Sequence, residues 1–463
     1  MDNLSISKKN LIILLCFFLA IIIGIVAIFV VYNITSDKSS AEAKNKPFNI
    51  TVSSGGDVTN SVDITWTTTA SSRGSYVQYV KKQSENESKP DFEKIQSTLY
   101  EGYMEETDLM FPVSGQEYEQ YPEMSASNMV IHRCFITGLE ADTSYWYRVG
   151  DRNSGLWSDV YTFTTAYSTS EMSEDGFNFL LYADSQGFLF SEMEVWQKVL
   201  ETSCKTYPDV DFMVHMGDFV EIANNGLLWQ YALNLAPDEI RNKTFFPVVG
   251  NKDLTFVTKY FTVGAESDNY IYNGWYSFDY EGVHFTVVNT GDETDITKQQ
   301  IKWIKKDLAA AKDALWKVVL IHKAPYSDAN HADDPDVAYL RQELMPLFEE
   351  YEVDVVIQGH DHFYFRSEPV ENGNVTEYTM LENSIMTNVQ SPVYFINGSA
   401  GIKQYDKTFR DMTGEIHTAY RDLLLSPSFS YCKVDETKII FDTYTVNRYT
   451  GEMNLVESWG IQK

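Results

Sequence analysis

The chain has 463 residues, which is long for one ordinary domain and suggests two or three. Its hydrophobic content of 44% is sufficient for packed cores and excludes a largely disordered protein, while 14% aromatic residues favour β-rich structure. The formal net charge of −30 excludes a partner that is nucleic acid, because the phosphate backbone would be repelled.

An apolar segment without a charged residue covers residues 11–32, shortly after Lys8 and Lys9. As a helix rising about 1.5 Å per residue it spans roughly 33 Å, enough for the core of a bilayer. Lysines before the segment and an acidic chain after it predict a cytoplasmic N-terminus (1–10), a single-pass anchor (11–32) and extracytoplasmic domains at the cell membrane. The alternative is a cleaved signal peptide ending near Ala43, but its apolar core normally covers only about 7–15 residues.

Residues 33–46 are small and polar and are predicted to be a linker. Residues 47–167 then alternate apolar and polar side chains, which predicts an all-β domain. The stretch 138–145, with Leu139 and Tyr145, resembles the turn into a late strand of a fibronectin type III sandwich. Because no cluster of metal-binding residue types occurs in this domain, a spacer or docking role is expected.

Residues 176–463 alternate apolar, strand-like runs with helical patterns, which predicts an α/β layered domain. Helices are expected at residues 191–204, 297–312 and 337–350. The last part of the chain returns to strand alternation at residues 393–396, 429–434 and 439–446.

Polar residues of the kinds that bind metals follow five predicted strands, each at the point where the strand ends. In chain order they are Asp184, Asp218, Asn251, His322, and the pair His360 and His362. Because carboxyl ends of strands converge on one edge of an α/β sheet, we expect these side chains to lie together. One aspartate after a strand is more often a turn or cap residue. Five such positions, which include three of the eight histidines, favour a functional site.

The chemistry of this set is that of metal-assisted hydrolysis. Carboxylate, amide and imidazole ligands suit manganese, iron or zinc, so two divalent or trivalent ions are the expected cofactors. A carboxylate such as Asp218 can bridge two metals roughly 3.5–4 Å apart, while His360 and His362 can point to different metals. Bridged metals acidify a shared water and hold the oxygens of a phosphate during an in-line displacement at phosphorus.

The chain resembles the calcineurin-like metallophosphoesterase superfamily in an ordered set of motifs: Asp184-x-x-Gly187, Gly217-Asp218, Gly250-Asn251-x-Asp253, His322 and Gly359-His360-x-His362. With the preceding β domain it is similar to purple acid phosphatases, more closely to their bacterial exported relatives, over residues 47–460. The resemblance implies a four-layer α/β/β/α fold for residues 176–463. It implies one metal held by Asp184, Asp218 and His362, and a second held by Asp218, Asn251, His322 and His360.

Two positions near the implied ligands depart from the family pattern. Glu221 stands where purple acid phosphatases have a tyrosine ligand, so neither the charge-transfer colour nor a fixed ferric site is expected. Gln186 stands where many superfamily members place a histidine. We expect Gln186 to be a weak metal ligand through its side-chain oxygen, with a water in that place as the alternative.

Two further residues are predicted to be catalytic. Lys252 stands where the family has a histidine that contacts the phosphate and the leaving group. An ammonium there can stabilise developing negative charge and donate a proton. His331 lies in a segment that resembles the substrate loop of the relatives, and it is the second candidate for phosphate contact or general acid. The alternative for His331 is an exposed loop histidine without a role.

The sequence therefore predicts a membrane-anchored, extracytoplasmic, acid phosphatase-like enzyme that hydrolyses phosphate esters through a metal-bridging hydroxide. Its expected partners are the membrane, through the anchor, and a phosphate ester that is either a small molecule or part of the cell surface. The alternative is a surface binding or adhesion protein that kept the fold but lost efficient catalysis, which Lys252 and Glu221 favour. The pattern sets neither the substrate nor the oligomeric state.

Overall fold

The structure is a computed structural model that describes residues 46–69, 74–106, 110–112, 124–126, 129–234, 238–263, 273–291, 296–405 and 417–463. The chain divides into a unit of residues Met1–Lys46 and a compact unit of residues Pro47–Lys463. Within the described ranges no helix has both the length and the apolar character needed to cross a bilayer. The predicted anchor at 11–32, and all of the predicted linker except Lys46, lie outside those ranges.

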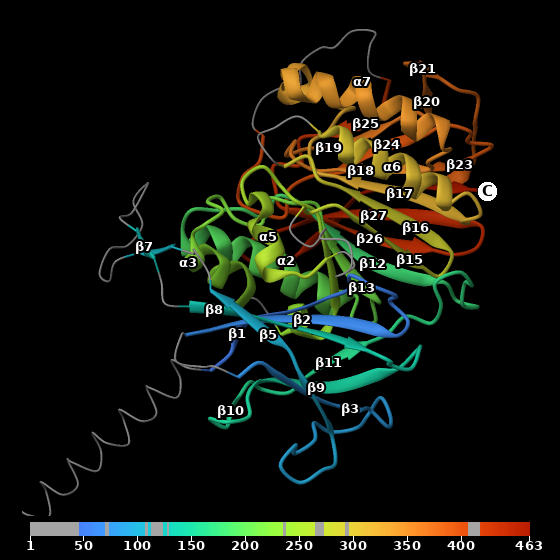
Figure 1. Ribbon diagram of the computed structural model, residues 1–463. Helices are drawn as coiled ribbons and strands as arrows, with labels where there is room; N and C mark the ends of the chain where they lie inside the picture. The colour runs from blue at the N-terminus through green and yellow to red at the C-terminus, as the bar shows by residue number, and fades with distance from the viewer. Residues whose placement is uncertain are drawn as a thin grey trace, which may run out of the picture. The chain divides into compact units, whose positions relative to one another are not determined.

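The first part of the compact unit is the expected all-β domain (Figure 1). Its strands are β1 (Phe48–Ser53), β2 (Ser61–Thr69), β3 (Tyr76–Lys81), β4 (Thr98–Glu101), β5 (Tyr103–Glu106), β6 (Met110–Pro112), β7 (Met124–Ala126), β8 (Met129–Thr137), β9 (Ser144–Asp151), β10 (Leu156–Trp157) and β11 (Tyr161–Thr164). One sheet has the order β1-β2-β8-β5, and another has β10-β9-β3-β4 with β11 on β9. Apolar side chains such as Ile64 and Val77 form the core. At the predicted corner the Tyr145 hydroxyl accepts a hydrogen bond from the Glu140 N–H at 2.9 Å; the specific likeness to fibronectin type III stays a prediction.

The second part is an α/β domain. Its strands are β12 (Phe177–Tyr182), β13 (Phe212–His215), β14 (Thr244–Pro247), β15 (Tyr276–Tyr280), β16 (Val283–Val288), β17 (Trp316–Ile321), β18 (Val355–Gln358), β19 (Tyr364–Ser367), β20 (Val370–Glu371), β21 (Asn374–Val375), β22 (Thr379–Met380), β23 (Ile385–Thr387), β24 (Val393–Asn397), β25 (Thr418–Asp422), β26 (Ser428–Val434), β27 (Lys438–Val446) and β28 (Met453–Gln462). Its helices are α2 (Phe190–Thr206), α3 (Gly226–Trp229), α4 (Glu239–Asn242), α5 (Val257–Tyr260), α6 (Lys298–Ala310) and α7 (Pro335–Glu350), with short π or 3₁₀ turns η1 (Gln230–Asn234), η2 (Leu254–Phe256), η5 (Asn330–Asp333) and η6 (Glu382–Ser384).

The three long helices confirm the predicted helical segments, and local chemistry fixes where two of them start. The Thr297 side chain accepts a hydrogen bond from the Gln300 N–H at 3.1 Å and caps α6. Pro335 begins α7, where its fixed backbone angle suits the first turn and its missing N–H costs no hydrogen bond.

Large sheets in the described part of this domain stack face to face. The first has the order β14-β13-β12-β26-β27-β28-β23-β22, and the second has β15-β16-β17-β18-β24-β19-β25. Aromatic rings fill the space between them, as where Phe246 stacks on Phe278 at 3.7 Å between centroids. Helix α2 covers the outer face of the first sheet through Trp196, and α6 and α7 cover that of the second through Leu308 and Leu344 (Figure 1). The arrangement is α/β/β/α in layers.

The expectation that the strand ends meet at the edge of one sheet needs correction. Strands β12, β13 and β14 run parallel in the first sheet, whereas β17 and β18 run parallel in the second. Asp184, Asp218 and Asn251 therefore extend from one sheet, and His322 and the His360–His362 pair from the other. Because the two sheets are stacked with these ends on the same side, the site is assembled across both layers.

Candidate metal centre

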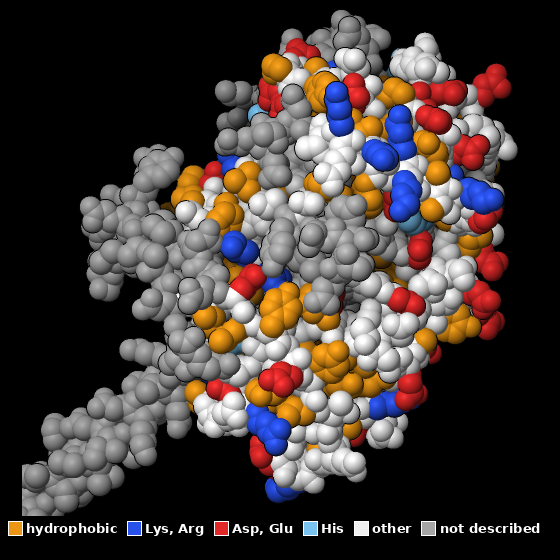
Figure 2. Space-filling model, viewed as in Figure 1, with side chains coloured by type: hydrophobic (Ala, Val, Ile, Leu, Met, Phe, Trp, Pro, Cys, Tyr) orange, Lys and Arg blue, Asp and Glu red, His pale blue; other side chains and the backbone are white. Residues whose placement is uncertain are grey.

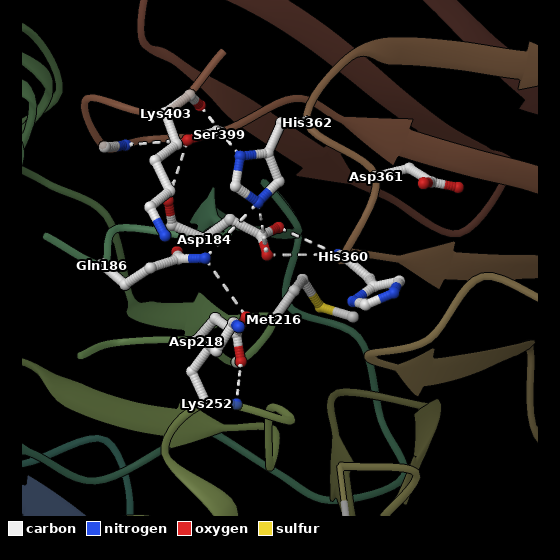
Figure 3. Close-up of polar contacts among 12 residues, drawn as sticks. Asp184, Gln186, Met216, Asp218, Lys252, His360, Asp361, His362, Ser399 and Lys403 are labelled. Carbon is white, nitrogen blue, oxygen red and sulfur yellow. Dashed lines mark hydrogen bonds and ion pairs between the residues drawn. The ribbon is translucent and has the colours of Figure 1, made fainter. Parts of the chain in front are cut away.

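Sharp backbone turns at the ends of the strands aim the candidate ligands at one another. Asp184, Asp218 and His360 have φ angles of 53°, 58° and 68°, in the left-handed region that residues with a Cβ rarely adopt. Each such turn costs about 1–2 kcal/mol, which packing of the surrounding sheets must offset. Figure 3 shows that the turns bring Asp184 and Asp218 into one cluster with His360 and His362.

One group of ligand atoms is formed around Asp218. A carboxylate oxygen of Asp218 and ring nitrogens of His322 and His360 all lie within 4.8 Å of one another. The side-chain oxygen of Asn251 lies 3.0 Å from Nε2 of His322. Nδ1 of His322 is 2.7 Å from the Met216 carbonyl and donates to it, so its Nε2 is left to face the cluster. The structure thus brings together the four residues that are predicted to hold the second metal.

Asp184, His362 and Gln186 form a second group of ligand atoms next to Asp218 (Figure 3). Nε2 of His362 is 3.5 Å from Oδ1 of Asp184, and Nδ1 of His362 donates to the Lys403 carbonyl at 2.9 Å. The Gln186 amide nitrogen lies 3.2 Å from Oδ2 of Asp218 and 3.4 Å from Nε2 of His362. Oδ1 of Asp218 lies 3.4 Å from Nε2 of His322 in the first group, so the two carboxylate oxygens contact different groups, as those of a bridging ligand must.

The chemistry of the donor set fits metal ions. Oε1 of Gln186 is buried and has no hydrogen-bond partner among the described residues, so it can serve as a ligand. Burial raises the pKa of the Asp218 carboxyl, with His322 opposing the rise and Asp184 adding to it. Burial and the neighbouring histidines lower the pKa of His360 well below its ordinary value. Cations bound here would stabilise ionised carboxylates and neutral imidazoles, the forms in which both bind metals.

Residues that the sequence prediction did not assign hold the ligand loops in place. The Asp253 carboxylate accepts the N–H of Phe219 at 2.7 Å and that of Gly250 at 2.8 Å, and so joins the loops that follow β13 and β14. The Ser399 hydroxyl donates to the Asp184 carbonyl at 2.8 Å. Asp253 was visible as part of a motif, whereas Ser399 follows β24 without any distinguishing pattern.

Both predicted catalytic residues lie beside the centre. The His331 ring lies 4.4 Å from the His360 ring, centroid to centroid, and its Nδ1 is 2.7 Å from a carboxylate oxygen of Asp334. The Lys252 ammonium is 3.6 Å from Oε1 of Glu221. Both side chains are partly exposed, so they occupy the rim of the buried ligand cluster. Their roles stay predictions, as do the individual ligand assignments.

Comparison with known proteins agrees with this geometry. Residues 47–165 match the family Purple acid Phosphatase, N-terminal domain, and residues 177–364 match Calcineurin-like phosphoesterase. Purple acid phosphatase 23 from Arabidopsis thaliana is 25% identical over 340 residues, which cover 66% of this chain and 70% of that protein. The Fe(3+)-Zn(2+) purple acid phosphatase 12 of the same plant is 27% identical over 299 residues, 58% of this chain and 59% of that one. A purple acid phosphatase structure from yellow lupin (Lupinus luteus) seeds shares the fold, with a TM-score of 0.69 and 17% identity over 90% of this chain and 74% of that chain.

The α/β/β/α domain and its ligand cluster define a calcineurin-like metallophosphoesterase, a class of metal-dependent phosphoric-ester hydrolases with dinuclear metal sites. The chain thus carries a purple acid phosphatase N-terminal domain followed by a calcineurin-like phosphoesterase domain, and the plant relatives reported above are purple acid phosphatases.

Proposed function

We propose that this protein hydrolyses phosphate esters at a centre whose ligands are Asp184, Asp218, Asn251, His322, His360 and His362, with Gln186 as a weaker ligand. The observation that carries the proposal is the position of Asp218 between two groups of ligand atoms. When bound, two metal ions supply a water activated at neutral pH and neutralise the charge on the phosphate oxygens. Iron, manganese and zinc suit the donor set, and one relative is named as an iron–zinc enzyme.

The protein's own groups position the phosphate and handle the proton. Hydrolysis adds the OH of water to phosphorus and breaks the bond to the leaving oxygen, which keeps the electron pair and takes the other proton. Lys252 and His331, on the rim of the cluster, steady the phosphate and donate that proton. Glu221 faces lysines instead of offering a phenolate, which supports a centre without the purple chromophore.

We also propose that the enzyme is held at the cell membrane by residues 11–32 and works outside the cytoplasm. The support is the uncharged, apolar character of that segment and the lysines that precede it. Expression of the full chain and of a chain lacking residues 1–32, followed by membrane fractionation and protease treatment of intact cells, tests this. Recovery of the full chain in the soluble fraction would exclude the anchor.

The hydrolytic proposal is tested by metal analysis and by assay of the purified protein on an aryl phosphate with added manganese, iron or zinc. Replacing Asp218 with Asn keeps the shape but removes the charge between the two metal groups, so we expect a loss of activity of roughly 100-fold or more and less bound metal. Asp211→Asn is the matched control, because Asp211 is a half-buried carboxylate directly before β13 that accepts the Asn178 N–H at 2.8 Å. Absence of both metal and turnover in the wild-type protein would exclude the proposal.

A further inference from the structure

A buried carboxylate beside the metal centre binds two lysines. Oε2 of Glu221 accepts a hydrogen bond from the Lys403 ammonium, and its Oε1 lies 3.6 Å from the Lys252 ammonium. The Glu221 side chain is only 7% exposed, whereas those of Lys252 and Lys403 are 40% and 34% exposed. One negative and two positive charges leave a net positive charge at this point of the rim.

The backbones of both lysines are tied to metal ligands. The Lys252 N–H donates to Oδ1 of Asp218 at 2.7 Å, and the Lys403 carbonyl accepts the Nδ1–H of His362 at 2.9 Å. Figure 3 shows the Lys403 side chain reaching from this carbonyl toward Gln186. Its ammonium also lies 5.2 Å from the centroid of the Phe188 ring, which further fixes its position. The lysine pair is therefore held in place next to the ligand cluster, before any substrate binds.

We propose that Lys403, with Lys252, forms a second phosphate subsite, and that the preferred substrates carry a second phosphoryl group linked to the one that is hydrolysed. The inference rests on the proposed function for the hydrolysis itself. A lysine ammonium has three N–H donors, of which Glu221 takes one, so donors remain on each lysine for the oxygens of an anion. One lysine alone would be neutralised by Glu221; the second supplies the surplus charge.

The overall charge of the protein strengthens this assignment. A chain with a formal net charge of −30 repels a ligand that carries several negative charges, unless local positive charge offsets the repulsion at the site. A substrate with one phosphoryl group can be neutralised by two metal ions. A second phosphoryl group needs its own cations, and Lys403 and Lys252 are placed to provide them.

Calorimetric titration of the metal-loaded protein with methylenediphosphonate and with phenylphosphonate, neither of which is hydrolysed, tests the subsite. We expect the wild-type protein to bind the diphosphonate about tenfold more tightly than the monophosphonate, as one charged contact can provide. Lys403→Gln should abolish this preference and change phenylphosphonate binding less than about twofold, and Lys403→Arg should retain the preference. Lys433→Gln, which removes a lysine paired with Asp442 at 2.6 Å outside the site, should behave as wild type.

The outcomes separate this subsite from the hydrolytic activity. A wild-type protein without the preference, or a Lys403→Gln variant that keeps it, overturns the subsite. Metal analysis after the titration shows whether the diphosphonate removes metal from the protein. Such removal does not depend on the Lys403 side chain, so an apparent preference that comes from metal loss persists in Lys403→Gln. That result counts against the subsite. Hydrolysis of aryl phosphates without the preference overturns the subsite alone. A preference that depends on Lys403 in a protein that hydrolyses no ester supports the subsite and contradicts the proposed function.

Discussion

Lys252 touches the metal centre in two ways at once. Its backbone N–H donates to Oδ1 of Asp218, and its ammonium lies 3.6 Å from Glu221 on the rim. A substitution of its side chain removes the second contact and leaves the first. Glu221 also keeps Lys403 as a partner, so loss of the Lys252 ammonium leaves no unpaired buried charge.

We predict that Lys252→Met lowers kcat/KM for an aryl phosphate by about 10–100-fold, because a positioned cation and proton donor is lost from the transition state. Bound metal should not change, since the backbone contact to Asp218 remains. Steady-state kinetics and metal analysis of the same preparation measure both effects. Lys198→Met is the control, because Lys198 pairs with Glu201 on the exposed side of α2, and both residues belong to that helix.

Lys252→His tests the alternative that the protein is a binding protein with a degraded site. An active enzyme that uses the ammonium should keep activity within about tenfold when histidine replaces it, because imidazole can also donate a proton. A wild-type protein with almost no turnover that becomes active on Lys252→His would instead show that catalysis had been lost at this position.

At this scale the sequence predicted residues better than contacts. Residues at strand ends, such as His322 and Asp218, could be found because strand order and residue type are both visible in the sequence. The contact between Glu221 and Lys403 could not, because 182 residues separate them and it depends on the loop after β24. The left-handed turns at Asp184 and Asp218 were also not predictable, since residue type alone favours other conformations there.

At the scale of elements, His284 joins helix α6 to the hairpin of β15 and β16. Nδ1 of His284 is 2.7 Å from Oδ1 of Asp279, and its Nε2 is 3.0 Å from Oδ2 of Asp307 in α6. Burial alone would lower the pKa of His284, but hydrogen bonds and charge from Asp279 and Asp307 outweigh it and raise the pKa to about 9. The histidine is therefore protonated in the folded protein at neutral pH.

We predict that His284→Gln destabilises the protein at pH 6 and changes its stability little at pH 10. The pKa of a histidine in the unfolded chain is about 6.5, whereas that of His284 in the folded protein is about 9. Protonation of His284 therefore stabilises the folded state, and this contribution is fully present below pH 6.5 and is lost as the pH rises through about 9. This difference in pKa corresponds to roughly 3 kcal/mol, which denaturant unfolding at several pH values measures.

Asp279→Asn should have a smaller effect than Asp307→Asn, because the Asp279 side chain is 56% exposed and screened by water. An equal effect of His284→Gln at both pH values would contradict the protonated bridge.

The elements themselves were predictable to different degrees. Helices α2 and α6 each bury one face, which gives their apolar residues a helical period, and strands β26 and β27 show the alternation of half-buried strands. These four elements could therefore be predicted from the sequence. The division of the parallel strands between two sheets was not, because a buried strand has the same apolar character in either sheet.

At the scale of the whole molecule, polar side chains of the β domain bind the backbone just after the metal-ligand loop. Arg133 in β8 is fully buried and donates to Oγ1 of Thr262 at 3.0 Å and to the Thr258 carbonyl at 2.8 Å. The Ser53 hydroxyl donates to the Thr262 carbonyl at 2.7 Å. Residues 258–262 follow the Asn251 loop through η2 and α5, so the β domain supports one side of the metal centre. The sequence had suggested only a spacer or docking role for this domain.

We therefore predict that the two domains unfold in one transition in calorimetry and that Arg133→Met separates them. The variant leaves the Thr258 carbonyl without its buried donor, and it should lower the free energy of unfolding by about 3 kcal/mol. The β domain should then melt first, and activity should fall at that lower temperature, because segment 258–262 loses its support. Arg148→Met is the matched control: Arg148 is also in the β domain, but its partners Gln78, Glu93 and Trp157 belong to that same domain. It should cost less than about 1 kcal/mol and leave one transition. If both variants melted in a single transition with similar losses, Arg133 would contribute to packing of the β domain alone, and the metal centre would not depend on contact between the domains.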